Sequence, residues 1–293
     1  MSASTTLYLT FVGSLILLVW SFYMPFRLGQ LYNGPVYCMA IGGYTAALLV
    51  KELGWPYLLA VAAAALMGAL FGFLPALGFS RTSGVTTAVA SMALIFIIQS
   101  IIGNLTFTGG MGGVQNVPKV SHLLLSTWVA VAAVGFLIYR LDHSRIGRAI
   151  ALIGTDPDLA RTLGINVRWM TVFSLTSSSV LGAIAGSFYA LNLRMLRPSI
   201  LAFSLVLTAA AMLFIGGRHT MWGAFISVPI LWGMPQWLPP SFAPYTRFVY
   251  GAILILVLVF RPSGLITPGV VRAIDFRRGR RRVPIGERTE QSL

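Results

Sequence analysis

The residues whose types could do chemistry gather in one charged stretch of this 293-residue chain, residues 140–168. It is the only long charged segment between apolar segments, and it holds five of the 21 basic residues (Arg140, Arg145, Arg148, Arg161 and Arg168). Charges in such a loop suit contact with another polypeptide. If the chain moves a solute, energy from a partner would be received here.

A short helix is expected inside this stretch. Thr155 or Asp156 is able to cap its first turn, where Pro157 is tolerated because its missing N–H is not needed. Asp158 complements the positive end of the helix dipole, and Gly164 suits the left-handed position that ends a helix. We therefore expect about two helical turns, held by packing because so short a helix is marginal alone. The residues taken alone fit a capped surface helix without a partner equally well.

Other reactive groups are scattered. The histidines at 122, 143 and 219 lie far apart and beside no carboxylate or thiol cluster, so no metal site is expected. Cys38 is the single cysteine, which excludes an intrachain disulfide. A phosphate-binding loop needs Gly-Lys-Ser/Thr, and neither of the two lysines stands in that context. We expect no cofactor and no ATP site.

The elements that must position this stretch are apolar. The composition is 57% hydrophobic, and apolar segments long enough to cross a bilayer recur along the chain. None of them holds Asp, Glu, Lys or Arg near its middle. We expect an all-α polytopic membrane bundle of about 8–10 helices. The nine segments are 7–26, 33–50, 55–79, 84–103, 123–140, 169–192, 200–217, 219–238 and 245–261.

The basic residues predict the orientation of the bundle. A net charge of +14 by itself suggests nucleic acid, but eight basic residues lie between 261 and 288 and five more in 140–168. With both segments in the cytoplasm, at least sixteen basic residues lie inside and five outside, as the positive-inside rule requires. We expect a membrane domain over 1–268 and a basic cytoplasmic tail over 269–293 that contacts anionic lipid, not nucleic acid.

Small residues at four-residue spacing indicate close helix packing. One stripe runs along 55–79 (Ala60, Ala64, Gly68, Gly72 and Ala76) and another along 169–192 (Ser178, Gly182, Gly186 and Ala190). Each striped segment is followed by an arginine, another segment and a glycine pair, which suggests an inverted internal repeat or a chance coincidence. Glycine and proline interrupt 33–50 and 219–238, so either could be broken or re-entrant.

Two other function classes fit less well. A secondary transporter driven by an ion gradient normally places Asp, Glu or His in the membrane, although a sodium site built only from carbonyls would escape notice. An intramembrane enzyme would need partners for the Ser/Thr-rich run 174–179, and no His-x-Glu, Gly-x-Ser-x-Gly or paired aspartates accompany it. We therefore do not expect an enzyme.

Five strings occur in an order typical of one family. They are LGQLYNGPVYCMAIGGYTAALL (28–49), LTFTGGMGGVQNVP (105–118), IGRAIALIGTDPDLARTLGINV (146–167), LFIGGRHTMWGAF (213–225) and YGAILILVLVFRPSGL (250–265). The chain resembles the inner-membrane permease subunits, M-type, of branched-chain amino acid ATP-binding-cassette importers. Asp158 and Leu159 stand where the family's coupling loop has Glu and Ala, and Gly42-Gly43-Tyr44 replaces its Gly-Ala-Tyr.

The resemblance implies a pore-forming subunit in a bacterial inner membrane, with a cytoplasmic C-terminus. Its partners would be an H-type permease, two cytoplasmic ATPases and a periplasmic solute-binding protein. It also implies an ATPase-coupling loop containing Asp156, Asp158, Ala160, Gly164 and Ile165. Branched-chain amino acids are the implied solutes, although related permeases carry urea, short amides and other small solutes.

Uncharged polar residues within or beside the apolar segments are candidates for the translocation path, because an amphiphilic solute needs weak, transient hydrogen bonds. They are Gln99, Asn104, Thr106, Thr108, Thr176 and Asn192. For each of them taken singly, ordinary hydrogen bonding between helices is the favoured explanation. Arg194 and Arg197 are the only close basic pair on the predicted outer side, where they suit docking of a binding protein or contact with lipid headgroups.

Overall fold

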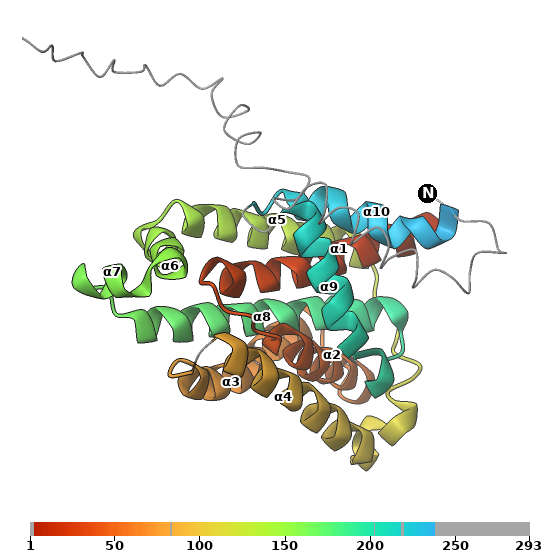
Figure 1. Ribbon diagram of the computed structural model, residues 1–293. Coiled ribbons are helices and arrows are strands. Elements are labelled where there is room, and N and C mark those ends of the chain that lie inside the picture. Colours follow the sequence, from red (N-terminus) through yellow and green to blue (C-terminus); the bar gives the residue numbers. More distant parts are fainter. Residues whose placement is uncertain (1–2, 83, 202, 218–219, 238–293) are drawn as a thin grey trace, which may run out of the picture.

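A computed structural model describes residues 3–82, 84–201, 203–217 and 220–237, and within them the regular secondary structure is helical apart from one isolated β-bridge. Figure 1 shows the helices packed as one bundle. The helices are α1 (Ala3–Arg27), α2 (Gly34–Glu52), α3 (Tyr57–Phe79), α4 (Gly84–Asn104), α5 (Leu123–Asp142), α6 (Arg145–Thr155), α7 (Pro157–Thr162), α8 (Val167–Leu193), α9 (Phe203–Gly216) and α10 (Gly223–Trp237), with three short 3₁₀ turns η1 (Thr106–Thr108), η2 (Gly110–Gly112) and η3 (Pro198–Leu201). The expected all-α class is confirmed.

Six segments of the described residues are long and apolar enough to cross a membrane: α1 from Thr5, α3, α4, α5, α8 and the stretch Pro198–Gly216 that contains α9. The chain is therefore a multi-pass membrane protein. α2 has 19 residues and lies mostly buried among its neighbours, and α10 has 15 residues. The predicted span 245–261 and the tail 269–293 lie outside the described residues.

The predicted break in segment 33–50 is wrong, because α2 is one continuous helix. Its two glycines bring backbones together instead of interrupting the helix. A Cβ on Gly42 would lie 2.4 Å from the carbonyl oxygen of Ala183 on α8, and one on Gly43 would lie 3.0 Å from that of Gly186. The segment predicted over 219–238 is helical from Gly223 and contains both of its prolines.

α8 lies in the middle of the bundle, where the small-residue stripes hold it (Figure 1). A Cβ on Gly182 would lie 2.4 Å from the carbonyl oxygen of Pro35, and one on Gly186 only 2.0 Å from that of Met39. Beside α2, Gly68 and Gly72 of α3 face α8 residues equally closely. Close backbone approach replaces the missing hydrophobic drive between helices in lipid. The stripes therefore act in packing, as predicted.

The helices alternate in direction. α2 and α8 run in the same sense, since Pro35 meets Gly182 and Met39 meets Gly186, whereas α3 runs opposite to α8. α1 and α5 end together, where Arg27 pairs with Asp142. The opposite sense of α3 and α8 agrees with the suggested inverted repeat, which itself stays a prediction.

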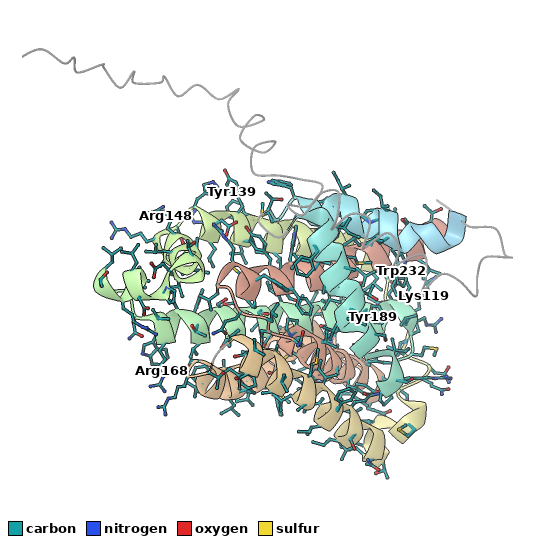
Figure 2. The ribbon with its side chains drawn as sticks, in the orientation of Figure 1. Lys119, Tyr139, Arg148, Arg168, Tyr189 and Trp232 are labelled. Atoms are coloured by element: carbon teal, nitrogen blue, oxygen red, sulfur yellow. The ribbon has the colours of Figure 1, made fainter. Side chains whose placement is uncertain are left out.

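The bundle has two distinct ends. We call the end that carries α6 and α7 the α7 end, and the other the far end; Figure 2 shows Arg148 and Arg168 at the former and Lys119 at the latter. Of the basic residues in the described ranges, seven lie at the α7 end (Arg27, Arg81, Arg140, Arg145, Arg148, Arg161 and Arg168) and four at the far end (Lys51, Lys119, Arg194 and Arg197). The described residues thus show the predicted charge asymmetry.

Candidate functional site: the α6–α7 element

α7 forms as its capping residues require. The Asp156 side chain accepts hydrogen bonds from the backbone N–H groups of Asp158 (3.0 Å) and Leu159 (2.9 Å), which have no partner inside the helix. Pro157 occupies the first turn. After the helix, Gly164 adopts a φ of +76°, and the N–H of Ile165 donates to the carbonyl of Ala160 at 3.0 Å. The short helix expected at 156–164 is thus present at Pro157–Thr162.

α7 has one face toward the protein and one toward solvent. Ala160 is fully buried and Ile165 packs against the main core. On the open face, Leu159 is 47% exposed and Leu163 is 65% exposed, beside an exposed ion pair between Asp158 and Arg161. Two exposed leucines at the tip of a short helix form an apolar contact surface that the sequence analysis missed. The sequence pattern that could have predicted this surface is their four-residue spacing, which puts both leucines on one face of a helix.

α6 connects this tip to the bundle, and it was not predicted as a separate helix. Ser144 caps it by accepting a hydrogen bond from the N–H of Gly147 at 3.2 Å. Three residues on one face are buried (Gly147, Ile150 and Ile153). Gly154 lies against the end of α1, since a Cβ there would lie 2.1 Å from the carbonyl oxygen of Arg27. The helix therefore packs on the α1 terminus so closely that no side chain fits at position 154.

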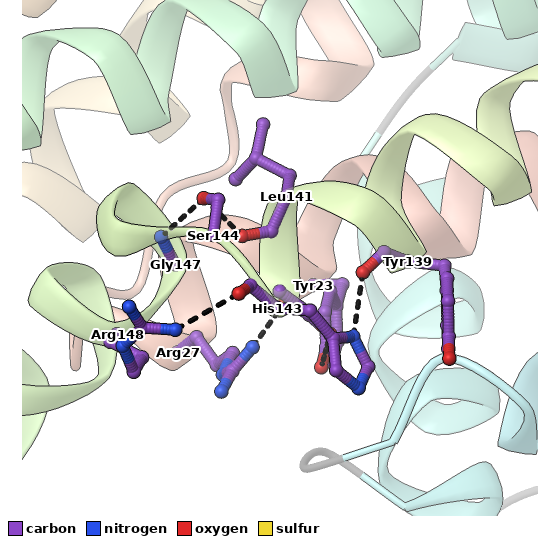
Figure 3. Close-up of polar contacts among 9 residues, drawn as sticks. Tyr23, Arg27, Tyr139, Leu141, His143, Ser144, Gly147 and Arg148 are labelled. Carbon is purple, nitrogen blue, oxygen red and sulfur yellow. Dashed lines mark hydrogen bonds and ion pairs between the residues drawn. The ribbon is translucent and has the colours of Figure 1, made fainter.

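An ion pair with one added hydrogen bond, here called the joint, holds the ends of α1 and α5 together just before α6 begins. Arg27 at the end of α1 pairs with Asp142 at the end of α5, and the Tyr23 hydroxyl donates to the other carboxylate oxygen at 2.8 Å (Figure 3). Just beyond, Arg148 donates to the carbonyl of His143 at 2.9 Å, which ties α6 back to the α5–α6 turn. Displacement of α6 must therefore move the ends of α1 and α5 or break these contacts. Sequence reasoning missed the joint because 115 residues separate the ion pair.

An open groove of about 580 Å³ lies between α6 and the start of α8. Its lining combines two arginines with aliphatic side chains and the backbone after α7 (Arg145, Ile146, Arg148, Ala149, Leu152, Gly164, Ile165, Asn166 and Met170). Two of the predicted coupling residues, Gly164 and Ile165, thus line a concavity beside α7. In the part of the chain that the structure describes, no three His, Cys, Asp or Glu side chains are grouped to hold a metal ion.

The far end contains the glycine-rich loop. η1 and η2 follow α4, with positive φ at Gly109 (77°), Gly110 (57°) and Gly113 (70°), so the backbone is irregular here. Residues 113–117 then pair with the segment after α8. The N–H of Val114 donates to the carbonyl of Leu196 at 3.0 Å, and the reverse bond is 2.8 Å. Arg194 and Arg197 lie beside this pairing and line a hollow of about 330 Å³.

None of the candidate path residues lines the groove or the hollow just described. Thr108 is buried and donates to the carbonyls of Ile102 and Leu105, both at 2.7 Å, which gives it a local structural role. Two others, Asn104 and Asn192, also donate to backbone carbonyls. Asn104 is exposed and donates to the carbonyl of Ser100, as Asn192 does to Leu7 at 3.4 Å.

Thr176 differs from the other path candidates. Its hydroxyl is buried within α8 without a hydrogen-bond partner, as are those of Ser174 and Ser178. Of the remaining two candidates, Gln99 is half-buried on α4 and Thr106 is exposed in η1. Unsatisfied buried hydroxyls are rare and need an explanation. The Ser/Thr-rich part of α8 therefore differs from the other candidate positions in holding buried hydroxyls without a partner.

Comparison with known proteins gives a consistent result. The family described as "Branched-chain amino acid transport system / permease component" matches residues 4–258. The chain is similar to the high-affinity branched-chain amino acid permease protein LivM of Escherichia coli, at 26% identity over 78% of this chain and 61% of LivM. The chain thus covers less than two thirds of that relative's length. No solved structure matches it significantly.

Other relatives are named for other solutes. The chain is 25% identical to the autoinducer 2 import system permease protein LsrC of Escherichia coli, over 75% of this chain and 69% of LsrC. It is 28% identical to the nucleoside ABC transporter permease protein NupC of Lactococcus lactis, over 73% of this chain and 76% of NupC. All these relatives are permeases of import or transport systems.

Proposed function

Because this chain belongs to the family of permease components of branched-chain amino acid transport systems, we propose that it forms the translocation path of an ATP-driven importer. One observation carries the proposal: a capped, two-turn helix with two exposed leucines stands out from one end of a membrane bundle. An isolated helix of this length is marginal in water, and exposing leucines there has no structural benefit. Both make sense if the helix enters a partner.

The partner of α7 in this proposal is a cytoplasmic ATPase subunit. Asp156, Asp158, Ala160, Gly164 and Ile165 are the proposed coupling residues, and the leucines of α7 add apolar contact area. Ala160 and Ile165 hold the helix to the bundle from behind. Movement of the ATPase would pass through α6 to the ends of α1 and α5, since the ion pair between Arg27 and Asp142 joins those ends.

The orientation follows from the charge asymmetry. Seven arginines at the α7 end against four basic residues at the far end of the described bundle favour a cytoplasmic α7 end. The same orientation puts the N-terminus outside. One further span over 245–261 would then bring the C-terminus and the basic tail 269–293 into the cytoplasm of a bacterium with an inner membrane.

The complete importer would contain more chains than this one. We propose two ATPase subunits, a second and homologous H-type permease that makes a heterodimer, and a periplasmic solute-binding protein. Arg194 and Arg197 lie at the outer end in this orientation, where exposed positive charge would steer docking of an acidic surface of the binding protein. The lipid bilayer is the remaining partner.

The proposed solute is a branched-chain amino acid or a related small polar molecule. LivM is named for branched-chain amino acids, whereas LsrC and NupC are named for autoinducer 2 and nucleosides, so the family alone does not fix the solute. Of the proposed path residues Gln99, Asn104, Thr106, Thr108, Thr176 and Asn192, Thr176 has the strongest support because its hydroxyl lacks a partner.

Reconstituted vesicles test the proposal against a gradient-driven carrier. Vesicles with the chain, its partner permease, the ATPases and the binding protein should accumulate solute only with ATP. Uptake by this chain alone, driven by a proton or sodium gradient, would overturn the proposal. The gradient-driven alternative is disfavoured because every acidic residue in the described range lies in a helix terminus or a connecting segment, away from the middle of a span.

A further inference from the structure

The hollow of about 330 Å³ at the far end has a lining unlike the rest of the bundle. Two arginines, two side-chain amides and two apolar residues surround it (Gln115, Asn116, Leu193, Arg194, Met195 and Arg197). None of these six residues is acidic. Its volume is at the lower end of the range for small-molecule sites, which suits a single small solute.

The rim of this hollow is rigidly built. Four hydrogen bonds join the loop before α5 to the segment after α8: two between Val114 and Leu196, one from the N–H of Val117 to the carbonyl of Arg194 (3.1 Å), and one from Arg194 Nε to the carbonyl of Val117 (3.0 Å). Tyr44 of α2 donates to the Leu196 carbonyl as well, at 3.0 Å. The lining residues are thus held by three separate parts of the fold.

Two lining residues are held in an unfavourable backbone conformation. Asn116 has a φ of +58° and Arg194 a φ of +57°, the left-handed region in which non-glycine residues are uncommon. Only three non-glycine residues of the described chain have a positive φ, and these two share one hollow. Such local strain persists where the surroundings enforce it, and it clusters at functional sites.

The lining offers complementary charges for a zwitterion. Within the described residues, the Arg197 side chain has no ion pair or hydrogen bond. Arg194 donates from Nε to the Val117 carbonyl on the rim, so its terminal N–H groups remain to bind a ligand. A planar guanidinium is the natural partner of a carboxylate. Leu193 is the last residue of α8, and the carboxyl end of a helix carries a partial negative charge suited to an ammonium group.

We propose that this hollow is an outer subsite for an α-amino acid. The carboxylate lies on Arg197 with help from Arg194, the ammonium group faces the carboxyl end of α8, and the aliphatic side chain contacts Leu193 and Met195. The inference rests on the proposed function and narrows its substrate class. Nucleosides and other uncharged solutes lack the carboxylate that the arginines would bind.

The test measures weak binding directly. The full chain, with its partner subunits in nanodiscs, is examined by saturation-transfer NMR with L-leucine, with L-leucinamide, which lacks the carboxylate, and with isovalerate, which lacks the ammonium group. Leucine should bind the wild type about tenfold more tightly than either analogue, since each lost charge-assisted contact is worth roughly that factor. Equal binding of leucine and leucinamide would overturn the subsite.

Variants assign the binding to the hollow. Arg197→Gln should reduce leucine binding to the level of leucinamide, and Arg197→Lys should retain part of it because the charge remains without the planar fork. Lys119→Gln removes an exposed charge from the same end, outside the hollow, and should leave binding unchanged. Thermal unfolding of each variant verifies its fold. Unchanged leucine binding in folded Arg197→Gln contradicts the proposal.

The experiment distinguishes failure of the subsite from failure of the proposed function and from a role of Arg197 in docking the binding protein. ATP-driven uptake by the wild-type importer is measured in the same preparation, so a failed importer and a failed subsite give different results. If Arg197 serves only to dock the binding protein, Arg197→Gln lowers the affinity of that protein and its salt dependence while leucine binding to the permease stays unchanged. That result also overturns the subsite.

Discussion

Arg27, the last residue of α1, forms an ion pair with Asp142, the last residue of α5, across 115 residues of sequence. Both side chains are mostly buried, with 23% and 16% of their surface exposed, and the Tyr23 hydroxyl completes the site at 2.8 Å. The pair stands directly before the turn into α6. It therefore joins the helix that carries the proposed coupling element to the first helix of the bundle.

Asp142→Asn should weaken this joint. The amide keeps the shape of the carboxylate but leaves Arg27 without its counter-charge, which should lower the free energy of unfolding by about 1–3 kcal/mol. Denaturant unfolding in detergent micelles measures the change. In the reconstituted importer, transport should fall more than ATP hydrolysis, because α6 is no longer held to α1.

A double-mutant cycle with Arg27→Gln isolates the pair. The two single variants should each destabilise the protein, and the double variant should be less destabilised than the sum of both. Arg168→Gln is the matched control, since Arg168 is an exposed arginine at the same end with no hydrogen bond or ion pair to the described residues. Additive effects of Arg27→Gln and Asp142→Asn would show that the contact is not energetically coupled.

The proposed coupling loop gives the second prediction. Asp158→Lys and Gly164→Pro should leave the permease inserted in the membrane but separate ATP hydrolysis from transport. Lysine repels Arg161 and opposes the helix dipole, and proline cannot adopt the φ of +76° at Gly164. Uptake and hydrolysis are measured on the same vesicles. Normal coupled transport in both variants contradicts the assignment of α7.

Gly164→Asn is the control for backbone geometry. A Cβ on Gly164 would meet no atom within 4 Å, so only the backbone conformation restricts this position. Asparagine tolerates the left-handed region better than other non-glycine residues. It should therefore couple nearly as well as the wild type. A loss of coupling equal to that of Gly164→Pro would show that the glycine is needed for contact with a partner instead of for its φ.

Local signals predicted the parts of this protein that depend on neighbouring residues. Asp156, Pro157 and Gly164 predicted α7 correctly because a cap, a first turn and a left-handed end are set within a few residues. The small-residue stripe through Gly182 and Gly186 predicted close packing because four-residue spacing puts these residues on one face of a helix, although it did not identify α2 as the partner.

Features set by distant residues were missed or misjudged. Asp142 gave no sign that Arg27 would meet it, because the pair exists only after α1 and α5 end together. Gly42 and Gly43 were read as a possible break, yet the α8 backbone against them keeps α2 helical. The path candidates were chosen by residue type, which does not distinguish the satisfied hydroxyl of Thr108 from the unpartnered one of Thr176.

Glycine packing against α8 supplies a third prediction. Gly186→Ala would put a Cβ 2.0 Å from the Met39 carbonyl oxygen, so α2 and α8 must separate, and the free energy of unfolding should fall by about 1–3 kcal/mol. Gly78→Ala, within α3, is the matched control, because its Cβ meets nothing within 4 Å. It should be neutral or stabilising by up to about 1 kcal/mol. Equal unfolding midpoints for both variants would exclude close α2–α8 contact.

The last prediction separates a structural threonine from a path threonine by replacing each with valine, which has nearly the same shape. Thr108→Val loses two hydrogen bonds to backbone carbonyls, so it should lower the free energy of unfolding by about 1 kcal/mol. Thr176→Val removes a buried hydroxyl that has no partner, so stability should stay equal or rise. The expected effect on transport is reversed: Thr176→Val should lower it, whereas Thr108→Val should leave it unchanged.

Solute uptake per folded molecule should therefore fall in Thr176→Val if the path opens beside α8 during transport, because the unpartnered hydroxyl would then hydrogen-bond a passing solute. Uptake per folded molecule by Thr108→Val should match the wild type. Binding-protein affinity and ATP hydrolysis, measured in parallel, keep the comparison to the path itself. Wild-type uptake by Thr176→Val would remove this residue from the path, and a drop in its stability would mean that the hydroxyl has a hydrogen-bond partner in the membrane.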